Sequence, residues 1–392
     1  MAGERSGQDV FSLLEKLQSN HITIHQNRCI QVRNRNAHCM RCAEVCTSGC
    51  ISYEDGQLSC DLSRCIGCSS CATACPTCAI EAHGPNDAEL LRECEAAMRA
   101  ADGQVVIACR ERLAADGARC DLGKVAGVRC LGRVEESLLV TLAARGAQGI
   151  TLAGLDCESC PHKTGRGMAE QVRDTTDTLL ETWNSGLRVQ IAQELPEAVL
   201  RAQDDGGVVG EGCSPAAQDE ADAAEESLRS AVEEAPGAGE QRYQRVMEDG
   251  TLPHFLPDRR ERLLNSLAEL GEPQEKTIET RLWGHVSIDE GLCKSCQMCA
   301  AFCPTGALAK FEDEDGDFGI EHSPADCVKC RCCEQICLGG ALSIDDEVFA
   351  PDLLSGAVER HVMKEGRRQH QGINQVTHTM RELLGNDQVY ER

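Results

Sequence analysis

The sequence predicts three folded units: two small α+β modules near the two ends and a central α/β domain with a parallel sheet. Three observations support this prediction. Two stretches of the chain carry closely spaced cysteines in a repeated pattern, and the stretch between them alternates strand-like and helical segments. An acidic segment rich in Ala and Gly separates the second unit from the third.

Composition limits both the cores and the partners of these units. The chain has 392 residues, 27 cysteines and only 3% aromatic residues, so we expect two or three domains with small cores that metal binding helps to stabilise. So many thiols, with no signal peptide and no apolar run of transmembrane length, predict a cytoplasmic location, or one at the periphery of a membrane complex. A net charge of -25 disfavours binding to nucleic acid or anionic lipid and favours partners with positive docking patches.

We expect residues 1–21 to form a helix and residues 22–84 to form the first module. Its clearest feature is the run Cys65, Cys68, Cys71 and Cys75, followed by Pro76. The spacing Cys-x2-Cys-x2-Cys-x3-Cys wraps thiolates around a cubane iron–sulfur cluster. Three cysteines on one tight loop cap three irons, and the fourth points away to serve a neighbouring cluster. The module is therefore predicted to hold two clusters.

The second run of this module is irregular. Residues 46–51, CTSGCI, align with residues 75–80, CPTCAI, which makes Cys46 the fourth cysteine and places Asn36 at the first position. Asn36 is a poor iron ligand, and Cys29 lies near enough in sequence to replace it. We therefore assign one cluster to Cys29, Cys39, Cys42 and Cys75, and its partner to Cys65, Cys68, Cys71 and Cys46.

An alternative run remains open for this module. It comprises Cys39, Cys42, Cys46 and Cys50 and needs one inserted residue. We interpret Cys50, Cys78 and Cys60 as buried small apolar residues rather than ligands.

Residues 85–202 are predicted to form the central domain. Strands are expected at 104–109, 124–130, 149–155 and 187–192, with helices marked by Val134, Leu138 and Leu142 and by the stripe from Met168 to Trp183. This alternation predicts a parallel, flavodoxin-like sheet covered by helices.

Cysteines follow the strands of this domain. Cys109 and Cys130 end the first two strands, and Cys157 and Cys160 follow the third. Because the carboxyl ends of parallel strands meet at one edge of the sheet, these four thiols are predicted to converge on one metal or cluster site. Cys120 is a spare or replacement ligand, and the alternative is a set of buried free cysteines. His162 and His38 lie outside the repeated pattern and are expected to line cluster-side surfaces rather than to bind metal.

Residues 203–245 are expected to be a flexible acidic linker, followed by a helix and the second module over residues 246–350. The helix is predicted by the apolar stripe Leu263, Leu264, Leu267 and Leu270.

The second module carries two runs with the cubane spacing. We assign one cluster to Cys293, Cys296, Cys299 and Cys337, and the other to Cys327, Cys330, Cys333 and Cys303. Zinc is the alternative metal, but it does not explain the third and fourth cysteines of each run. A helical tail is expected over residues 351–392, with a stripe from Ile373 to Leu384 that packs on its own module or docks a partner.

The cysteine runs make both modules resemble bacterial two-cluster ferredoxins, over about residues 22–84 and 283–346. The resemblance implies a pseudo-two-fold α+β fold around two 4Fe-4S clusters, with electron carriage as the activity.

The segments at 128–134 and 146–165 make the central domain similar to the iron–sulfur delta subunit of methyl-viologen-reducing hydrogenases. That family implies a 2Fe-2S cluster and a role in relaying electrons between larger subunits. Cys130 and Cys160 fall on family positions, whereas Leu155 stands where another family cysteine is expected.

Two functions compete on these grounds. In the first, the chain is an electron-transfer subunit with four 4Fe-4S clusters and one further 2Fe-2S or 4Fe-4S cluster, working between subunits of hydrogenase, heterodisulfide reductase-like or molybdopterin oxidoreductase type. In the second, it is an enzyme that reduces a disulfide or sulfur compound at Cys157 and Cys160. The sequence shows no dinucleotide fingerprint, phosphate loop or flavin signature, which favours the first function.

Overall fold

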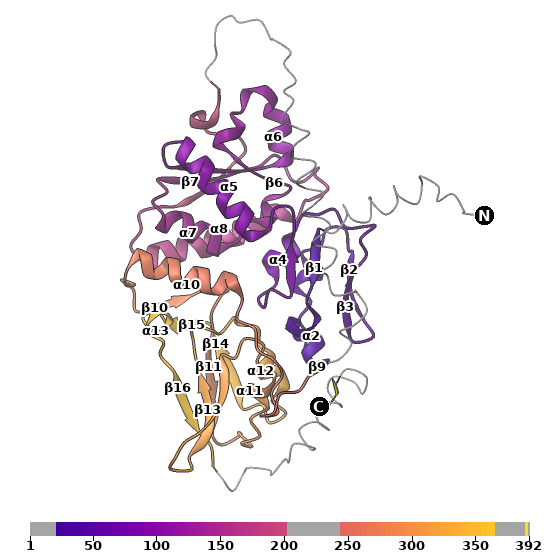
Figure 1. Cartoon of the computed structure of the whole chain (residues 1–392), viewed down its shortest axis with the longest axis vertical. Helices are drawn as coiled ribbons and strands as arrows, with labels where there is room; N and C mark the ends of the chain where they lie inside the picture. Colours follow the sequence, from indigo (N-terminus) through magenta and orange to yellow (C-terminus); the bar gives the residue numbers. More distant parts are fainter. Residues whose placement is uncertain (1–20, 202–243, 365–388, 391–392) are drawn as a thin grey trace, which may run out of the picture.

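The computed structural model describes residues 21–201, 244–364 and 389–390, and it divides into three parts (Figure 1). The central part, residues 85–201, occupies one end of the molecule, and the C-terminal part, residues 244–364, occupies the other. The N-terminal part, residues 21–84, lies beside both. The predicted tail stripe from Ile373 to Leu384 falls outside the described residues, as do residues 1–20 of the predicted N-terminal helix and residues 203–243 of the predicted linker.

The central part contains a four-stranded parallel sheet with the strand order β6-β5-β7-β8. Its strands are β5 (Gln104–Cys109), β6 (Ala126–Val128), β7 (Gly149–Ala153) and β8 (Val189–Ala192). Each forms where an apolar strand was predicted, and their near-continuous burial is typical of a sheet covered on both faces. The prediction of a parallel sheet in the middle of the chain is confirmed.

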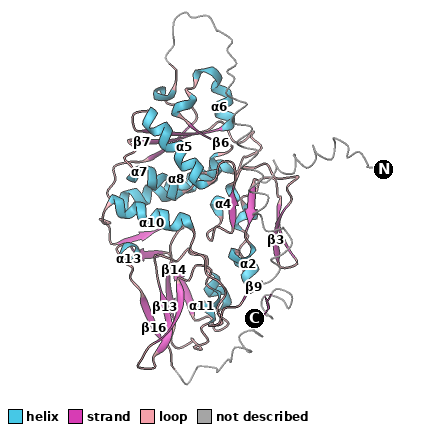
Figure 2. Ribbon diagram, in the orientation of Figure 1, coloured by secondary structure: helices cyan, strands magenta, loops and turns pink. Residues whose placement is uncertain are grey.

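Helices cover one face of this sheet (Figure 2). They are α5 (Asp87–Ala100), α7 (Glu136–Ala144) and α8 (Gly165–Thr182). Helix α7 has little amphipathic character because it is buried on nearly all sides, between the sheet and the C-terminal part. The other face is covered by α6 (Arg110–Asp116) and by an apolar core that includes Cys120, Leu195 and Val199.

The N-terminal and C-terminal parts share one arrangement of elements. In the N-terminal part, β1 (Ile22–Ile24) pairs antiparallel with β4 (Ile80–Ala82). Between these strands lie, in chain order, α2 (Ile30–Arg33), α3 (Arg41–Glu44), β2 (Ile51–Glu54), β3 (Gln57–Cys60) and α4 (Ser70–Ala74). In the C-terminal part, β11 (His285–Ile288) pairs antiparallel with β14 (Leu342–Asp345), and they enclose α11 (Met298–Phe302), β12 (Leu308–Glu312), β13 (Phe318–His322) and α12 (Cys332–Ile336). Both parts therefore have an outer strand pair, an inner hairpin and short helices after the cysteine runs.

Further elements extend the C-terminal part. They are α10 (Asp258–Leu270), β10 (Thr277–Glu279), β15 (Glu347–Phe349), α13 (Asp352–Ser355) and β16 (Glu359–Val362), with the short pair β9 (Gln244–Arg245) and β17 (Val389–Tyr390). The structure differs here from the expected helical tail, because Glu359–Val362 form a strand that pairs with β13. His361 is half-buried and the other three residues of this strand are exposed, and the charged side chains of Glu359 and Arg360 are typical of an edge strand.

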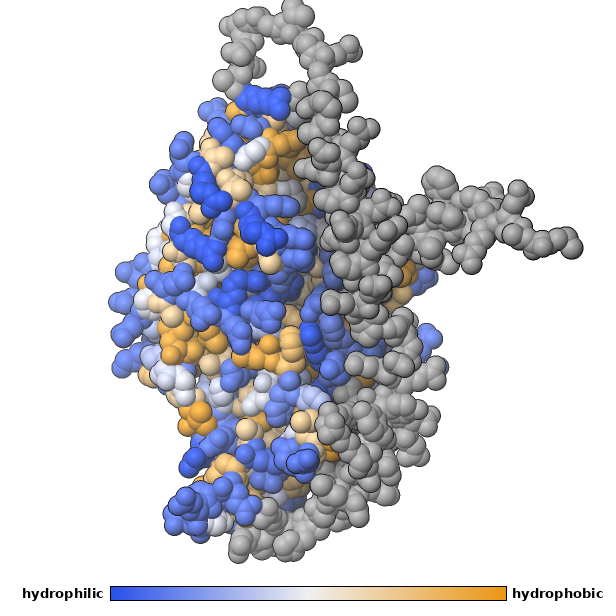
Figure 3. Space-filling view, in the orientation of Figure 1, coloured by the Kyte–Doolittle hydropathy of each residue, from blue (hydrophilic) through white to orange (hydrophobic). Residues whose placement is uncertain are grey.

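Helix α10 carries the predicted leucine stripe, but the stripe packs across to the central part. Leu263 and Leu267 join Val140 of α7 and Leu179 of α8 in one apolar core, together with Trp283. No helix within the described ranges is both long and apolar enough to cross a membrane. The face shown in Figure 3 is mostly hydrophilic, with scattered apolar areas.

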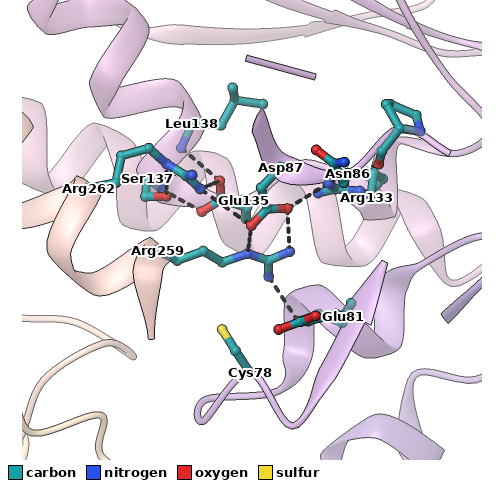
Figure 4. Close-up of polar contacts among 12 residues, drawn as sticks. Cys78, Glu81, Asn86, Asp87, Arg133, Glu135, Ser137, Leu138, Arg259 and Arg262 are labelled. Carbon is teal, nitrogen blue, oxygen red and sulfur yellow. Dashed lines mark hydrogen bonds and ion pairs between the residues drawn. The ribbon is translucent and has the colours of Figure 1, made fainter. Parts of the chain in front are cut away.

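An ionic network at Asp87 joins the three parts (Figure 4). Its carboxylate lies 2.6 Å from Arg133, 2.5 Å from Arg259 and 3.5 Å from Arg262. Arg259 also donates to the carbonyl of Ala72, in the N-terminal part. Although burial opposes ionisation, the hydrogen bond and charge of Arg259 and the charges of Arg133 and Arg262 hold the pKa of Asp87 well below its usual range.

We expect Asp87→Asn to lower the free energy of unfolding by about 3 kcal/mol at pH 7, because it leaves buried guanidinium groups without their counter-charge. The pKa of Asp87 is lower in the folded chain than the value of about 3.9 for the unfolded chain, so its contribution is complete above that pH and is lost as the pH falls further. Anaerobic urea unfolding at pH 7 and in the acid range measures both effects.

The matched control is Asp174→Asn, which removes an exposed carboxylate paired with Arg173. It should change stability by less than about 0.5 kcal/mol. Equal losses in the two variants would contradict a joining role for Asp87.

Candidate metal centres

The three regular cysteine runs adopt the same backbone conformation. In each run, the residues before and after the second cysteine have positive φ angles. These are Gly67 and Ser69, Ser295 and Gln297, and Lys329 and Arg331. This conformation turns the chain so that three successive cysteines face one point, and the short helix that follows begins with the third cysteine inside its first turn. The loop geometry is therefore a property of the spacing and not of glycine.

Glycine is nevertheless required at one of these positions. A Cβ atom on Gly67 would lie 2.8 Å from the ring of His21, whereas Ser295 and Lys329 occupy the equivalent positions in the other runs. The close approach of His21 explains why this run alone carries glycine there.

The C-terminal part brings its eight predicted ligands into two groups. Burial raises the pKa of Cys299, and negative charge on Cys296, Cys293 and Cys337 raises it further. These four thiols are group 4. Burial likewise raises the pKa of Cys333, as do the charges of its neighbours. Group 3 comprises Cys303, Cys327, Cys330 and Cys333.

The N-terminal part forms two groups in the same way. Burial raises the pKa of Cys42 to about 12, and the charges of Cys75, Cys29 and Cys39 add to the effect. These four thiols are group 2. Burial also raises the pKa of Cys71, together with charge on its neighbours. Group 1 comprises Cys46, Cys65, Cys68 and Cys71.

The irregular first run lacks the loop conformation of the others. No residue from Asn36 to Cys42 has a positive φ angle, and Cys29 instead reaches group 2 from the N-terminus of α2. Cys50 lies elsewhere, with its sulfur 3.4 Å from that of Cys46 and 3.5 Å from that of Cys60. The geometry thus favours Cys29 over Cys50 as a neighbour of Cys39, and the ligand assignment itself stays a prediction.

Backbone amides donate to the fourth cysteine of each regular run. The N–H groups of Ala79, Leu308 and Ala341 lie 3.2, 3.4 and 3.3 Å from the sulfurs of Cys75, Cys303 and Cys337. Hydrogen bonds of this kind stabilise the thiolate and are among the features that set the reduction potential of a bound cluster.

The four cysteines of the central part gather at the carboxyl edge of the sheet. Burial raises the pKa of Cys130 to about 12, and charge on Cys68, Cys157 and Cys109 raises it further. Burial, and then Cys160, raises the pKa of Cys157. Cys120 is fully buried in the opposite apolar core and does not join this central group.

The five groups follow one another through the molecule. Cys130 of the central group interacts with Cys68 of group 1, and Cys71 of group 1 interacts with Cys42 of group 2. Cys332 lies between Cys303 of group 3 and Cys39 and Cys29 of group 2. Groups 3 and 4 lie in the same part, where α11 (Met298–Phe302) contains Cys299 of group 4 and is followed directly by Cys303 of group 3. The series therefore continues from the central sheet through the N-terminal part into the C-terminal part.

A close contact between α2 and α11 joins groups 2 and 3. Ile30 and Ala37 pack against Phe302, Met298 and Cys332 in one apolar core. Arg33 is 1% exposed, and its guanidinium donates across the contact to the carbonyls of Phe302, Cys303 and Pro253 at 3.3, 3.1 and 2.8 Å. Burial lowers the pKa of Arg33, and the thiols of Cys332, Cys303 and Cys330 oppose that shift.

Three cysteines near group 1 were missed as a set by sequence reasoning. The sulfurs of Cys50, Cys60 and Cys65 all lie within 4.8 Å of one another, close enough to hold one metal ion. Cys60 belongs to β3, and the β2–β3 hairpin, in which Cys60 pairs with Ile51, brings it to Cys50. Cys332 was also missed, although it immediately precedes Cys333.

His162 contacts the sulfur of Cys160 at 3.7 Å and the carbonyl of Ile66 at 3.2 Å, and therefore lies between the central group and group 1.

The donors that these groups offer fit iron–sulfur clusters. The atoms brought together in groups 1 to 4 are thiol sulfurs, and no cysteine in the described ranges forms a disulfide. Buried neighbouring thiols with raised pKa values stay protonated until a multivalent cation compensates the thiolate charges. Thiolates are the ligands of cubane clusters.

Comparisons with known proteins agree with this chemistry. Residues 292–341 match the model of the 4Fe-4S dicluster domain, and residues 121–198 match that of the methyl-viologen-reducing hydrogenase delta subunit. An uncharacterized ferredoxin from Methanocaldococcus jannaschii is 39% identical over 64 residues, which is 16% of this chain and 97% of that protein. The chain belongs to the ferredoxin family. The ferredoxin match covers one module-sized stretch, and no solved structure matches the chain significantly.

We expect Cys29→Ala to lower the iron content of the anaerobically isolated ferredoxin by up to about four atoms per chain, because group 2 loses a ligand. Cys50→Ala should leave the iron content unchanged. Iron and acid-labile sulfide analysis, with the visible absorption of the clusters, measures the difference.

Cys94→Ala is the matched control, since Cys94 is buried in the central apolar core and belongs to no thiol group. Loss of iron in Cys50→Ala with retention in Cys29→Ala would reverse the assignment.

Proposed function

We propose that the chain is an electron-transfer subunit of a redox complex. In this proposal, groups 1 to 4 hold four 4Fe-4S clusters, in two modules at residues 22–84 and 246–350, and the central group at residues 85–202 holds a further 2Fe-2S or 4Fe-4S cluster. The observation that carries the proposal is the series of neighbouring thiol groups, in which successive groups share an apolar core or a direct contact. When bound, such clusters supply one-electron carriers.

The chain's own residues would hold these carriers in order and keep water from them. Arg33 supplies a buried positive charge between groups 2 and 3, and Arg260 does so beside group 3, where it donates to the carbonyl of Cys327 at 3.3 Å. Its guanidinium also lies 4.4 Å from the ring centroid of Trp283. Both arginines are nearly fully buried, and both point their donors at backbone carbonyls of the cysteine loops. We infer that they offset the negative charge of the thiolate groups.

The two ends of the series suggest where partners bind. At one end, Cys157 and Cys160 of the central group are partly exposed. At the other, Leu292 and Leu338 flank group 4, and Leu338 is 93% exposed. An exposed apolar side chain beside a redox centre is a feature that a docking partner would cover.

The match of the central part to a hydrogenase delta subunit supports association with a redox complex. We propose partners of hydrogenase, heterodisulfide reductase-like or molybdopterin oxidoreductase type.

A second function, reduction of a disulfide or sulfur compound, is favoured by one observation. Cys157 lines an open cavity of about 650 Å³ together with Lys163 and Arg166. Turnover of a disulfide by the isolated chain, lost in Cys160→Ser, would support this function in place of a relay.

Metal analysis of the anaerobically isolated chain tests the proposed function. We expect about sixteen irons and as many sulfides per chain for four cubanes, and two to four more irons if the central group is filled. On reduction, magnetic coupling between neighbouring clusters should broaden their electron paramagnetic resonance signals. A colourless protein, or one that holds zinc in these groups, would overturn the proposal.

We further expect Arg33→Met to lower the reduction potentials of the clusters in groups 2 and 3, because a positive charge favours the reduced, more negative cluster. The expected shift is on the order of 30–60 mV, where about 59 mV corresponds to a tenfold change for a one-electron couple. Anaerobic redox titration followed by electron paramagnetic resonance gives the potentials.

Arg35→Met is the control, since Arg35 is exposed on the same turn of the chain. Arg33→Lys distinguishes the effect of the positive charge from that of the hydrogen bonds, because lysine keeps the charge and loses most contacts to the carbonyls. Potentials in Arg33→Met equal to those of Arg35→Met would show that Arg33 joins the parts without affecting the redox centres.

A further inference from the structure

Two histidines and a glutamate lie together on the strands of the C-terminal part, outside every cysteine group. His285 is on β11, His322 is at the end of β13, and Glu359 begins β16. The pairing of β13 with β16 places His322 directly opposite Glu359. One ligand atom from each of these three residues lies within 4.8 Å of the others.

His322 is an unexplained buried polar group. Its side chain is 5% exposed, and neither ring nitrogen has a hydrogen-bond partner among the described residues. A buried donor or acceptor left without a partner costs about 1–3 kcal/mol. Nδ1 of this ring faces Oε2 of Glu359 at 4.0 Å, a distance too long for a hydrogen bond and suitable for a group placed between them.

His285 is oriented from both sides. Its Nε2 lies 2.8 Å from Oε2 of Glu359, and its Nδ1 lies 3.6 Å from Oδ2 of Asp345, on the paired strand β14. The hydroxyl of Ser287 donates to the same oxygen of Asp345 at 2.9 Å. The rings of His285 and His322 meet edge to face, with centroids 5.8 Å apart and an interplanar angle of 71°. Nε2 of His285 thus faces Glu359 and His322, and Nδ1 faces the carboxylate of Asp345.

We propose that His285, His322 and Glu359 bind a divalent zinc ion. Two imidazole nitrogens and one carboxylate oxygen are a donor set that zinc accepts, with a fourth position left for water. The ion would take up a ring nitrogen of His322 that has no partner. Asp345, whose Oδ2 lies 3.6 Å from Nδ1 of His285, would favour this orientation of the ring by its charge, as carboxylates beside zinc-bound histidines do.

The site has a structural consequence for group 4. Strand β16 leads into Met363, whose N–H donates to the carbonyl of Phe318 at 2.8 Å, and into Lys364, whose carbonyl lies 3.5 Å from the hydroxyl of Ser295. Ser295 belongs to the loop that carries Cys293 and Cys296. A zinc ion joining β11, β13 and β16 would therefore fix the segment that packs on this cysteine loop.

The donor chemistry separates this site from the cysteine groups. It offers nitrogen and oxygen ligands, whereas groups 1 to 4 offer sulfur. Zinc bound at the two kinds of site therefore differs in bond length, with about 2.0–2.1 Å to nitrogen and about 2.3 Å to sulfur.

The test uses the full chain, isolated anaerobically with its iron in place, incubated with zinc and then freed of unbound metal by gel filtration. We expect about one zinc per chain by elemental analysis. Zinc-edge X-ray absorption should show only nitrogen and oxygen neighbours at about 2.0–2.1 Å. Competition with a chelator gives the dissociation constant.

His322→Ala and Glu359→Gln should each weaken zinc binding at least tenfold and leave iron and sulfide unchanged. Asp345→Asn should weaken it about tenfold, as expected for a residue that orients a ligand. His83→Ala is the control, because it removes an exposed imidazole that forms a hydrogen bond with Thr23, away from the proposed site. Unchanged iron in each variant shows that the fold survives.

Three outcomes would overturn the proposal. They are an iron-loaded chain that retains no zinc, an absorption spectrum with sulfur neighbours, and variants that bind zinc as tightly as His83→Ala. None of these depends on electron transfer, so the zinc site can fail while the iron–sulfur function stands.

Discussion

The contact between α2 and α11, closed by the guanidinium of Arg33, is the interaction on which the arrangement of the thiol groups depends. The two cysteine-rich parts lie far apart in the sequence, and this contact packs the segments of groups 2 and 3 against each other. It is unusual in pairing a buried cation with backbone carbonyls instead of a carboxylate. Such a cation is tolerated where anionic groups lie close by, and Cys303 and Cys330 become such groups when they bind metal as thiolates. The same logic appears at Asp87, where three arginines converge on one carboxylate and join the central part to helix α10.

Local patterns in the sequence predicted the elements but not their assembly. The strand at 104–109 and the helices at α7 and α8 follow from apolar periodicity, and the gathering of Cys109 and Cys130 follows from the geometry of parallel strands. The leucine stripe of α10 was recognised, yet its partner surface on α7 was not, because periodicity shows that a face is apolar and does not show what covers it. Helix α5 was missed, although Asn86 and Glu89 form a capping box at its start.

The sites missed by the sequence share one cause. Cys60 meets Cys50 through a hairpin, and His285, His322 and Glu359 come from three strands whose pairing no local spacing encodes. Ligands on one loop leave a recognisable spacing, whereas ligands on separate strands do not. The grouping of Cys29 with Cys39 is intermediate, since the internal repeat indicated that a ligand was absent and the fold shows which thiol lies near.

The burial of Ile30 and Ala37 against Phe302 bears on how the protein matures. A ribosome releases the first cysteine-rich stretch long before the helix that covers it, so these side chains stay in contact with water during most of translation. Delivery of iron and sulfide to the neighbouring thiols is unobstructed in that interval and is restricted once synthesis ends. The order of biosynthesis therefore sets a period for cofactor insertion. A chain that leaves the ribosome without iron and sulfide would have to open the contact between α2 and α11 before it could take them up.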